Sequence, residues 1–533
     1  MKKYFFIIIF ILSACHYFPD FCHGIPAAPI IHKLTQWDGT TFSAIQWGDE
    51  WSHGWETLDG YTIIFDQNTQ NWNFAVTDNN GKLIPSKNVV GRDQLPMNLK
   101  IHLRPKEKEL DRIRQRKMTQ LSKVTKRTVT STGTANIPVI LINFKGTNST
   151  YDTQDFETLL FSPGNKSMKD YYEEISYGVF TVSSGPAGVA GWYESKRRHN
   201  YYGRNNTNGD DRYPAKLVIE AVTAADAVVD FSDYDMDGDC YCDVVAIVHQ
   251  GTGEESGGKS TDIWSHRWNL NSANYFGDGT GEYTTNDKAE CGNIKINDYI
   301  IQPEILDGQI QTMGVFAHEF GHSLGLPDLY DIDNSSEGIG NWCLMAAGSW
   351  NYIDRSGDSP AHMSAWCKYF LGWVMPTRIT ETLTEESIEP ANEVMDVYQF
   401  SPSKSSGIGE YFLIENRQLS GFDEGLPGNG LAIWHIDEKQ STNKKEYYPP
   451  FNIFGHYKVA LEQADGLWHL EKNNNRGDAG DLYPGSSDNR SFNNNSTPNS
   501  KLYNGSPSNF SITAITSFGS TLTATFSVLH DAE

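Results

Sequence analysis

Apolar positions along the chain come in short runs, and the spacing of these runs changes from one region to the next. Between about residues 26 and 100, strand-like runs such as 61–65 alternate with turn signals. From residue 137 onward, apolar runs typical of buried strands, such as 137–144 and 244–248, alternate with helical patterns. This alternation continues to about residue 376 and predicts an α/β or α+β body.

The pattern changes again beyond about residue 390, where helical signals fade and strand-like runs recur. Glycine, asparagine and serine separate these runs, which predicts a β-rich C-terminal region with the form of a sandwich. The segment 473–509 is rich in Asn and Ser, so we expect a long loop there. The strand-like runs are 411–415, 431–436, 457–461, 510–516 and 522–528.

The segment 105–127 differs from both of its neighbours, because it has nine Lys or Arg residues, three acidic residues and few apolar positions. Such a segment offers no face that could bury a core. We expect an exposed linker with a processing site at Lys126-Arg127, and the alternative is a solvated helix that is never cut. The predicted division is 1–24 (signal peptide), 25–104 (compact β-rich unit), 105–135 (basic linker), 136–390 (α+β domain) and 391–533 (β-rich region).

The N-terminus has the features of an export signal. Lys2-Lys3 precedes an apolar run at 4–12, which is shorter than the roughly 20 residues of a membrane-spanning helix. The run leads into Leu12-Ser13-Ala14-Cys15, which resembles the lipobox of bacterial lipoproteins, where the cysteine carries the lipid. We expect an exported protein that is lipid-anchored through Cys15 at the bacterial cell surface or outer membrane, or simply secreted after cleavage before Ile25. A lipid anchor would be its contact with a membrane.

The chain is strongly acidic, with a formal net charge of −24. This charge argues against a nucleic-acid partner, because a phosphate backbone attracts clustered cations. It suits an exported protein that must stay soluble, or one that supplies carboxylates to calcium. Seven cysteines in 533 residues do not make a disulfide scaffold, although six remain for pairing if Cys15 carries lipid. The connectivity stays open, and Cys240-x-Cys242 has no second close pair with which to bind a zinc ion.

One segment combines two histidines and a glutamate at the spacing of a zinc site, His318-Glu319-x-x-His322. Residues i and i+4 lie on one face of a helix, about 6 Å apart along its axis, so both imidazoles can reach one Zn²⁺ at about 2.0–2.1 Å. Glu319 lies between them and can act on water at the open coordination position. Gly325 then ends the helix, so that Asp328 can return as a third ligand.

These residues predict the hydrolysis of peptide bonds at a zinc ion. Zinc lowers the pKa of its bound water and polarises the scissile carbonyl. Glu319 is the expected general base, which accepts the water proton and delivers it to the leaving amine. Tyr352 or Tyr330 is a candidate to help hold the oxyanion, although packing is the simpler interpretation for either.

The segment from His318 to Asp328 resembles the extended HExxHxxGxxD motif of metzincin-type metallopeptidases, many of which have a histidine in place of Asp328. Residues 342–350 resemble their Met-turn, which implies that Met345 lies beneath the zinc. More narrowly, the chain resembles the M6 family, the immune inhibitor A-like bacterial peptidases. Further matching stretches are Ser265-His266-Arg267-Trp268, Asp328-Leu329-Tyr330-Asp331, Pro360-Ala361-His362-Met363, Leu371-Gly372-Trp373-Val374, Glu415-Asn416-Arg417-Gln418, Ile433-Trp434-His435-Ile436-Asp437 and Glu462-Gln463-Ala464-Asp465-Gly466.

The resemblance covers most of residues 26–530 and implies an α+β fold. The expected architecture is a metzincin-like zincin catalytic domain, preceded by a β-rich propeptide and followed by a β-rich C-terminal region. The implied protein is a monomeric zinc endopeptidase made as a zymogen, with proteins or peptides as substrates. The alternative is a catalytically inactive surface protein whose C-terminal region binds glycans or host matrix. The intact metal motif favours the enzyme.

Further acidic residues concern metals and latency. The segment 233–243 resembles a calcium loop, with carboxylates at alternating positions and a glycine for the turn, so calcium is the predicted metal ion. Gly477, Asp478, Gly480 and Asp481 form a weaker second candidate. Residues 26–100 contain no cysteine, so a latency ligand from that unit would be an acid or histidine such as Asp49, Glu50 or His53. The predicted calcium ligands are Asp233, Asp235, Asp237, Asp239 and Asp243.

Overall fold

The computed structural model describes residues 23–106, 128–206, 209–402, 409–449, 455–516 and 519–529. The predicted signal peptide with Cys15 and most of the basic linker, including Lys126-Arg127, lie outside the described residues. Among the helices in the described ranges, none has both the length and the apolar character needed to cross a bilayer.

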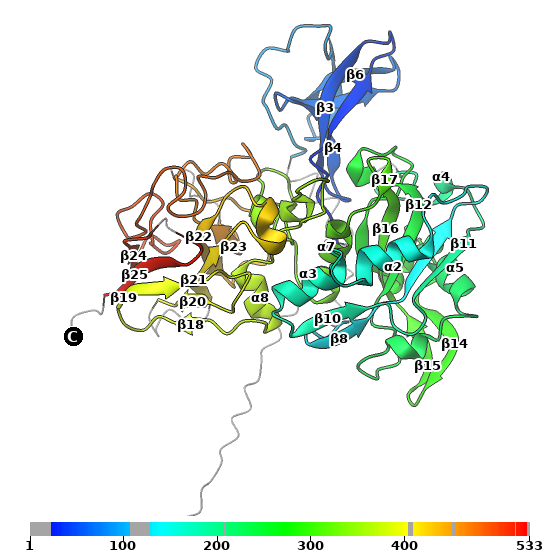
Figure 1. Ribbon diagram of the computed structural model, residues 1–533. Coiled ribbons are helices and arrows are strands. Elements are labelled where there is room, and N and C mark those ends of the chain that lie inside the picture. The colour runs from blue at the N-terminus through cyan, green and yellow to red at the C-terminus, as the bar shows by residue number, and fades with distance from the viewer. Residues whose placement is uncertain are drawn as a thin grey trace, which may run out of the picture.

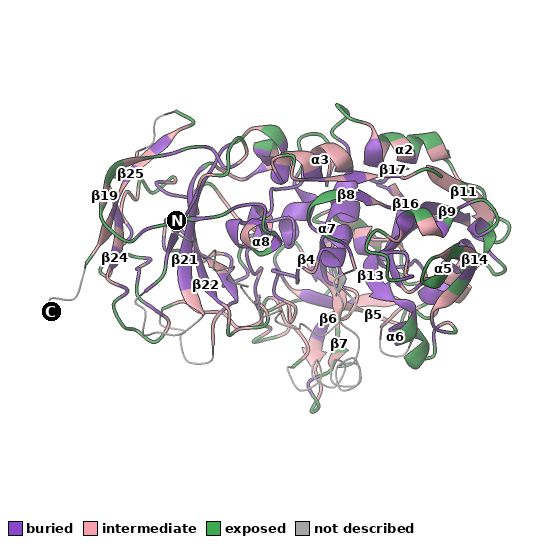
Figure 2. Ribbon diagram, turned by 90° about the horizontal axis from the view of Figure 1, so that it is seen from below, coloured by how far each residue is buried: buried purple, intermediate pink, exposed green. Residues whose placement is uncertain are grey.

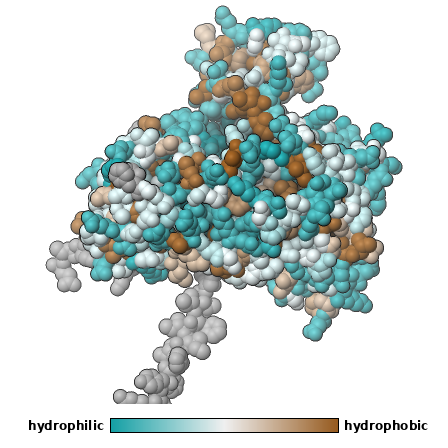
Figure 3. All heavy atoms as spheres, viewed as in Figure 1, coloured by the Kyte–Doolittle hydropathy of each residue, from teal (hydrophilic) through white to brown (hydrophobic). Residues whose placement is uncertain are grey.

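The N-terminal unit is one antiparallel sheet that projects from the rest of the molecule (Figure 1). Its strands follow one another in sequence order, because short turns join neighbours directly. A small core forms around Ala44, Ile63, Phe74 and Val90. Apolar atoms also gather on its side and where it meets the body (Figure 3). The six strands are β2 (Ile31–Thr35), β3 (Thr41–Gly48), β4 (His53–Thr57), β5 (Thr62–Asp66), β6 (Asn71–Thr77) and β7 (Leu83–Val89).

The central domain is built on a seven-stranded sheet with the order β1-β13-β16-β12-β9-β11, and β17 pairs with β16. The pairs of β16, β12, β9 and β11 are parallel, whereas β13 is antiparallel to β16 and β1 is antiparallel to β13. The strands are β1 (His23–Gly24), β9 (Val139–Asn143), β11 (Val189–Glu194), β12 (Val245–Thr252), β13 (His266–Asn269), β16 (Asp298–Leu306) and β17 (Gln309–Ile310).

Alternate side chains of the parallel strands enter two different cores, because successive residues of a strand point to opposite faces. Val139 and Leu141 pack toward the side of α2, α3, α7 and α8. Ile140 and Ile142 pack toward the side of α5 and α6. The apolar runs of these strands are continuous for this reason. The helices are α2 (Thr153–Phe161), α3 (Met168–Ile175), α4 (His199–Tyr202), α5 (Pro214–Ala225), α6 (Leu270–Tyr275), α7 (Met313–Ser323) and α8 (Ala365–Leu371).

Smaller elements complete this domain. A disulfide joins Cys240 to Cys291, which is the pairing that the sequence left open, while Cys242, Cys343 and Cys367 are buried free thiols. The two-stranded ladders are β8 (Gly133–Asn136) with β10 (Phe180–Ser183) and β14 (Tyr283–Ala289) with β15 (Gly292–Ile296). The 3₁₀ turns are η1 (Phe231–Tyr234), η2 (Glu254–Ser256), η3 (Gly340–Trp342), η4 (Ala347–Trp350) and, further on, η5 (Gly421–Gly425).

The C-terminal region consists of two sheets that share one core. Ile388, Phe526, Phe412 and Ile414 from the two sheets meet there. Between β23 and β24 the described residues form no helix or strand, so a long connection lies where the Asn-rich segment predicts it. The five-stranded sheet contains β18 (Thr377–Arg378), β20 (Val397–Phe400), β21 (Glu410–Arg417), β22 (Gly430–Asp437) and β23 (Val459–Leu461), and the three-stranded sheet contains β19 (Leu383–Ile388), β25 (Leu522–Val528) and β24 (Phe510–Thr513).

Strands β21 and β22 are buried on both faces (Figure 2). Phe412 and Ile414 face the C-terminal core, whereas Leu413 and Trp434 belong to the core beneath α7. The C-terminal region therefore packs directly against the layer that holds the predicted metal motif. Helices and strands occur in one chain in the proportions and segregation of the α+β class, which confirms the predicted fold class.

Candidate metal centre

Helix α7 presents His318, Glu319 and His322 from a position that solvent does not reach. Its end is set by Gly325, whose φ of +92° lies in the left-handed region that favours glycine. The Gly325 N–H donates to the carbonyl of His322 over 2.9 Å, and the chain then turns back. Asp328 is thereby brought beside the two histidines.

The three predicted ligands converge on one point. The Nε2 atoms of His318 and His322 lie 3.2 Å apart, and Asp328 Oδ1 lies 3.3 Å from each. Each Nδ1 lies 2.8 Å from a backbone carbonyl, that of Leu344 for His318 and that of Leu326 for His322. A carbonyl can only accept, so each Nδ1 carries the proton and each Nε2 offers a lone pair. Two lone pairs and a carboxylate at this separation fit a zinc ion between them.

Met345 lies directly against the helix between the two histidines. A Cβ built at Gly321 would lie 2.6 Å from Met345 Sδ, so only glycine lets the thioether approach this closely. The Met345 carbonyl accepts the Leu329 N–H over 2.7 Å, which ties the predicted Met-turn to the segment carrying Asp328. The turn thus supports two of the three converging side chains.

Glu319 occupies an isolated polar position. Its side chain is fully buried, and neither carboxylate oxygen has a hydrogen-bond partner among the described residues. Burial, followed by the charges of Asp328 and Glu255, raises the pKa of Glu319 well above its usual range. Burying carboxylate oxygens without hydrogen-bond partners costs free energy. We therefore expect a group bound at this site to interact with them.

An extended segment of the chain itself lies along this centre. Strand β1 pairs antiparallel with β13, the edge strand of the central sheet. Three side chains of the body then donate to three successive carbonyls of the segment. Tyr330 Oη donates to Gly24 O over 2.8 Å, Trp264 Nε1 to Ile25 O over 2.9 Å and Trp350 Nε1 to Pro26 O over 2.7 Å. Addition of a strand to an exposed sheet edge is a common way to hold an extended peptide.

Of the three latency candidates in the N-terminal unit, Glu50 faces the centre. Both of its carboxylate oxygens are buried, and no described residue hydrogen-bonds to them. A Cβ on Gly24 would lie 2.3 Å from Glu50 Oε2, so Glu50 lies against strand β1. Burial, and then the charges of Asp49, Asp328 and Glu319, raise its pKa well above the usual range.

The other two candidates have different neighbours. Asp49 Oδ1 accepts the N–H groups of Trp51 and Ser52, each over 2.9 Å. The His53 ring stacks on Trp264 at 4.7 Å between centroids, and its Nε2 lies 3.5 Å from Glu254. The His53 contacts thus hold the N-terminal unit against the central domain.

The two tyrosines proposed for the oxyanion differ in position. Tyr330 is buried and donates to the carbonyl of Gly24 in β1, whereas Tyr352 is 56% exposed. Tyr330 is therefore the one that already contacts a peptide carbonyl. Asp331, adjacent in sequence, accepts from Ser335 and Ser336 instead of joining the histidines.

The calcium candidates come together in part. Asp235, Asp237 and Asp239 have carboxylate oxygens within 4.8 Å of one another. Asp235 is also the centre of a turn, because it accepts the N–H groups of Gly238, Asp239 and Cys240. Asp233 and Asp243 are outside this group of three. Burial, and then the charges of Asp237, Asp235 and Asp239, raise the pKa of Asp243 to about 7, so it lies close by.

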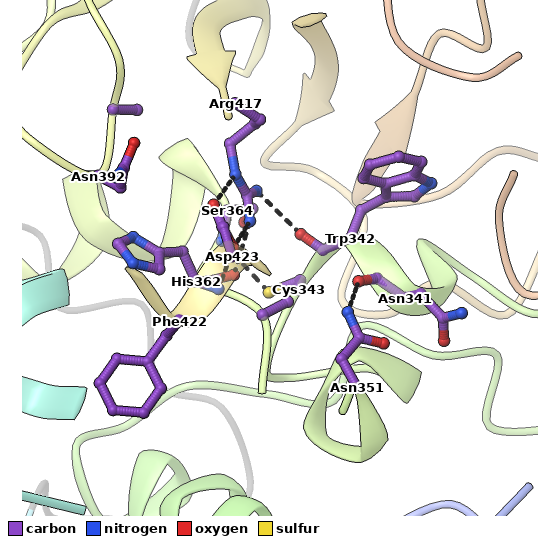
Figure 4. A network of polar contacts seen from close by, with 12 residues as sticks. Asn341, Trp342, Cys343, Asn351, His362, Ser364, Asn392, Arg417, Phe422 and Asp423 are labelled. Atoms are coloured by element: carbon purple, nitrogen blue, oxygen red, sulfur yellow. Dashed lines mark hydrogen bonds and ion pairs between the residues drawn. The ribbon is translucent and has the colours of Figure 1, made fainter. Parts of the chain in front are cut away.

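A buried ionic network links the metal layer to the C-terminal region (Figure 4). Arg417 of β21 is fully buried and binds both oxygens of Asp423, each over 2.7 Å. Its Nη1 donates over 3.0 Å to the carbonyl of Trp342, the first residue of the predicted Met-turn. The sequence marks Arg417 only as part of a matching stretch, because nothing local indicates that its partners lie far away along the chain.

Comparison with known proteins shows what the domain that holds these residues is similar to. Residues 142–378 match the family model described as "Immune inhibitor A peptidase M6, catalytic domain". The Pre-pro-metalloprotease PrtV of Vibrio cholerae serotype O1 (strain M66-2) is 33% identical over 256 residues, which are 42% of this chain and 26% of that protein. Immune inhibitor A of Bacillus thuringiensis subsp. alesti is 36% identical over 223 residues, 36% of this chain and 30% of that protein.

The match thus spans 26% and 30% of the length of these two relatives. The range that matches the family model includes the residues from His318 to Met345, and it supports the resemblance to the M6 family that the motifs indicated.

Proposed function

We propose that this M6-family metallopeptidase is an exported, zinc-dependent endopeptidase that is made as a zymogen. The observation that carries the proposal is the convergence of His318 Nε2, His322 Nε2 and Asp328 Oδ1 within 3.3 Å of one another, beside the buried carboxylate of Glu319. Protein or peptide chains are the proposed substrates, and His318, His322 and Asp328 are the proposed zinc ligands.

Each group of the site has a defined task in this proposal. Zinc, when bound, supplies Lewis acidity and an activated water. The carbonyls of Leu344 and Leu326 keep both imidazoles in the tautomer that presents Nε2. Glu319 receives a proton from water and passes it to the leaving amine. The phenol of Tyr330 is placed to donate to a carbonyl of a bound chain, as it does to Gly24 O.

The zymogen proposal rests on strand β1 and Glu50, which lie beside the proposed metal centre. A substrate chain would need the same edge strand, β13, that β1 occupies. The side chain of Glu50 adds a carboxylate next to the proposed metal centre. Because the N-terminal unit is tethered to the domain it covers, its effective concentration is high, and modest intrinsic affinity is enough for inhibition. A cut in the linker would remove that advantage and permit release.

A casein digest tests the proposed function. We expect the full-length protein to be weakly active, and protein cut between residues 101 and 136 to digest casein until a zinc chelator is added. Mass spectrometry would map the cut. Chelator-resistant digestion would exclude the zinc mechanism. Full activity before cutting, or activation without a cut in that interval, would exclude the zymogen.

Export and calcium are the remaining parts of the proposal. The name of one relative, a pre-pro-metalloprotease, describes for that protein a chain with pre- and pro-segments. Export of this chain rests on its charged and apolar N-terminus, with Cys15 as the proposed lipidation site. Asp235, Asp237 and Asp239 are the proposed core of a calcium site.

A further inference from the structure

We propose that the loop at residues 465–481 binds a second divalent transition-metal ion through Asp465, His469 and Asp478. The loop belongs to the long connection between β23 and β24, outside the residues that match the family model. One ligand atom of each of the three side chains lies within 4.8 Å of the other two. A ring nitrogen and two carboxylates at this separation are a donor set that can hold one ion.

The loop is arranged by its own hydrogen bonds. His469 Nδ1 lies 2.9 Å from Asp478 Oδ2, which also accepts Asn475 Nδ2 over 2.7 Å. Asp478 Oδ1 accepts the Gly480 N–H over 2.8 Å, and Asp465 Oδ1 accepts the Leu467 N–H over 2.9 Å. Both carboxylates are thus oriented by groups within the loop, as metal ligands usually are.

A second observation points independently to a cation. Asp481 is completely buried beside this group, and its Oδ1 has no hydrogen-bond partner in the described part of the chain. Its Oδ2 accepts Trp342 Nε1 over 2.9 Å and the Asp478 N–H over 3.0 Å. Asp481 thus adds a third carboxyl group beside Asp465 and Asp478, so a bound cation would compensate the charge of these groups.

Gly480 shows how closely the backbone approaches these carboxylates. A Cβ at this position would lie 2.5 Å from Asp465 Oδ2 and 2.9 Å from Asp478 Oδ1. Any side chain here would displace both oxygens. The glycine therefore keeps the space between the two carboxylates open for a ligand.

The imidazole of His469 indicates which class of metal ion the site would bind. Calcium and magnesium prefer oxygen ligands, whereas imidazole suits zinc and other first-row transition metals. We therefore assign the site to Zn²⁺ or an ion of the same class, held at the surface of the C-terminal region rather than in the catalytic cleft.

Trp342 would connect the proposed metal site to the layer that holds the catalytic residues. The indole of Trp342 donates to Asp481, and the next residues are Cys343, Leu344 and Met345 of the Met-turn. The Asn341 N–H donates to the Arg476 carbonyl over 2.7 Å, which adds a second link from the loop to the same turn. A metal ion that orders the loop would thus support the Met-turn from behind.

Metal analysis of the full-length chain tests the assignment without depending on activity. The double variant His318→Ala/His322→Ala removes the proposed catalytic site. After zinc loading and dialysis against metal-free buffer, we expect this variant to retain about one equivalent of zinc by elemental analysis. Adding His469→Ala should remove it, and adding Asp488→Asn, an exposed aspartate of the same connection, should not.

A cobalt titration provides an independent readout if His469→Ala folds poorly. The His318→Ala/His322→Ala protein should develop a visible Co(II) absorption band at one equivalent, and Asp478→Asn should abolish it. The assignment is overturned if the double variant retains no zinc and develops no band, or if its zinc survives His469→Ala. Retention of calcium instead, lost in Asp478→Asn but not in His469→Ala, would overturn the transition-metal class. None of these outcomes depends on whether the catalytic proposal holds.

Discussion

Within the described part of the chain, two groups of histidine and carboxylate side chains are close enough together to hold a metal ion, and they are built in different ways. In the first, His318 and His322 stand on a buried helix, and backbone carbonyls fix both tautomers. In the second, Asp465, His469 and Asp478 stand on a loop and are half-buried. The first is surrounded by the largest apolar core, while the second is held by hydrogen bonds within the loop.

The two clusters therefore differ in how far their geometry depends on a bound metal ion. A cluster on a packed helix keeps its geometry without a ligand, because the helix and the core determine where the side chains lie. A cluster on a loop has less to hold it, so metal binding and loop order must be coupled. We therefore expect metal removal to stop chemistry at the first cluster and to loosen structure at the second.

The largest expected effect comes from Glu319→Gln in the helical cluster. The change keeps the shape of the side chain but removes the general base, so turnover should fall by about 10²–10⁴-fold. Zinc content should stay the same, because Glu319 is not one of the converging ligands. The measurement is peptidase rate and zinc content of the same cut preparation. Near-wild-type turnover would rule out the proposed base.

The next largest effect concerns zinc binding, which we expect to differ between variants of Asp328 and of its neighbour Asp331. Asp328→Asn should weaken zinc binding at least by about 10–100-fold, since even the loss of a group that only orients a ligand costs that much. Asp331→Asn should leave zinc binding unchanged, because Asp331 accepts from Ser335 and Ser336. Dialysis against a competing chelator compares the two. Equal retention of zinc in both variants would show that Asp328 is not a ligand.

A smaller effect is expected at Glu50, which brings the N-terminal unit to the helical cluster. Glu50→Ala should raise the activity of the uncut protein several-fold and leave the activity of the cut protein unchanged. Asp59→Ala, which alters an exposed carboxylate of the same unit, is the matched control. The measurement is casein hydrolysis before and after limited proteolysis. An unchanged ratio of the two rates would mean that Glu50 has no part in latency.

The smallest effect concerns the predicted calcium loop. Asp237→Asn should reduce the calcium-dependent gain in Tm by about 2–4 °C, which corresponds to about 1 kcal/mol in a domain of this size. Thermal unfolding with and without calcium checks this, with Asp488→Asn as the control. A calcium effect of the same size in Asp237→Asn and in the wild type would contradict the site.

The helical cluster could be predicted from the sequence because its ligands are close together along the chain. His318, His322 and Asp328 lie within eleven residues, and a helix followed by a glycine turn is sufficient to bring them together. The loop cluster was indicated only in part. Asp478 and Asp481 stood out, but His469 and Asp465 are separated from them by a segment without periodicity. The Cys240–Cys291 pairing likewise spans 51 residues and had no local signal.

The amino-acid sequence was sufficient to predict the metal motif, a central body that is α/β or α+β, the β-rich character of both flanking regions and Glu50 as one of three latency candidates. Each of these follows from local spacing, periodicity or composition, which the chain carries irrespective of its partners. Three contacts became known only from the tertiary structure: β1 lies on β13, Glu50 rather than Asp49 or His53 faces the centre, and Arg417 donates to the first residue of the predicted Met-turn. Such contacts join residues far apart in the chain, and they form because each buried charge and each open sheet edge needs a partner that local sequence does not specify.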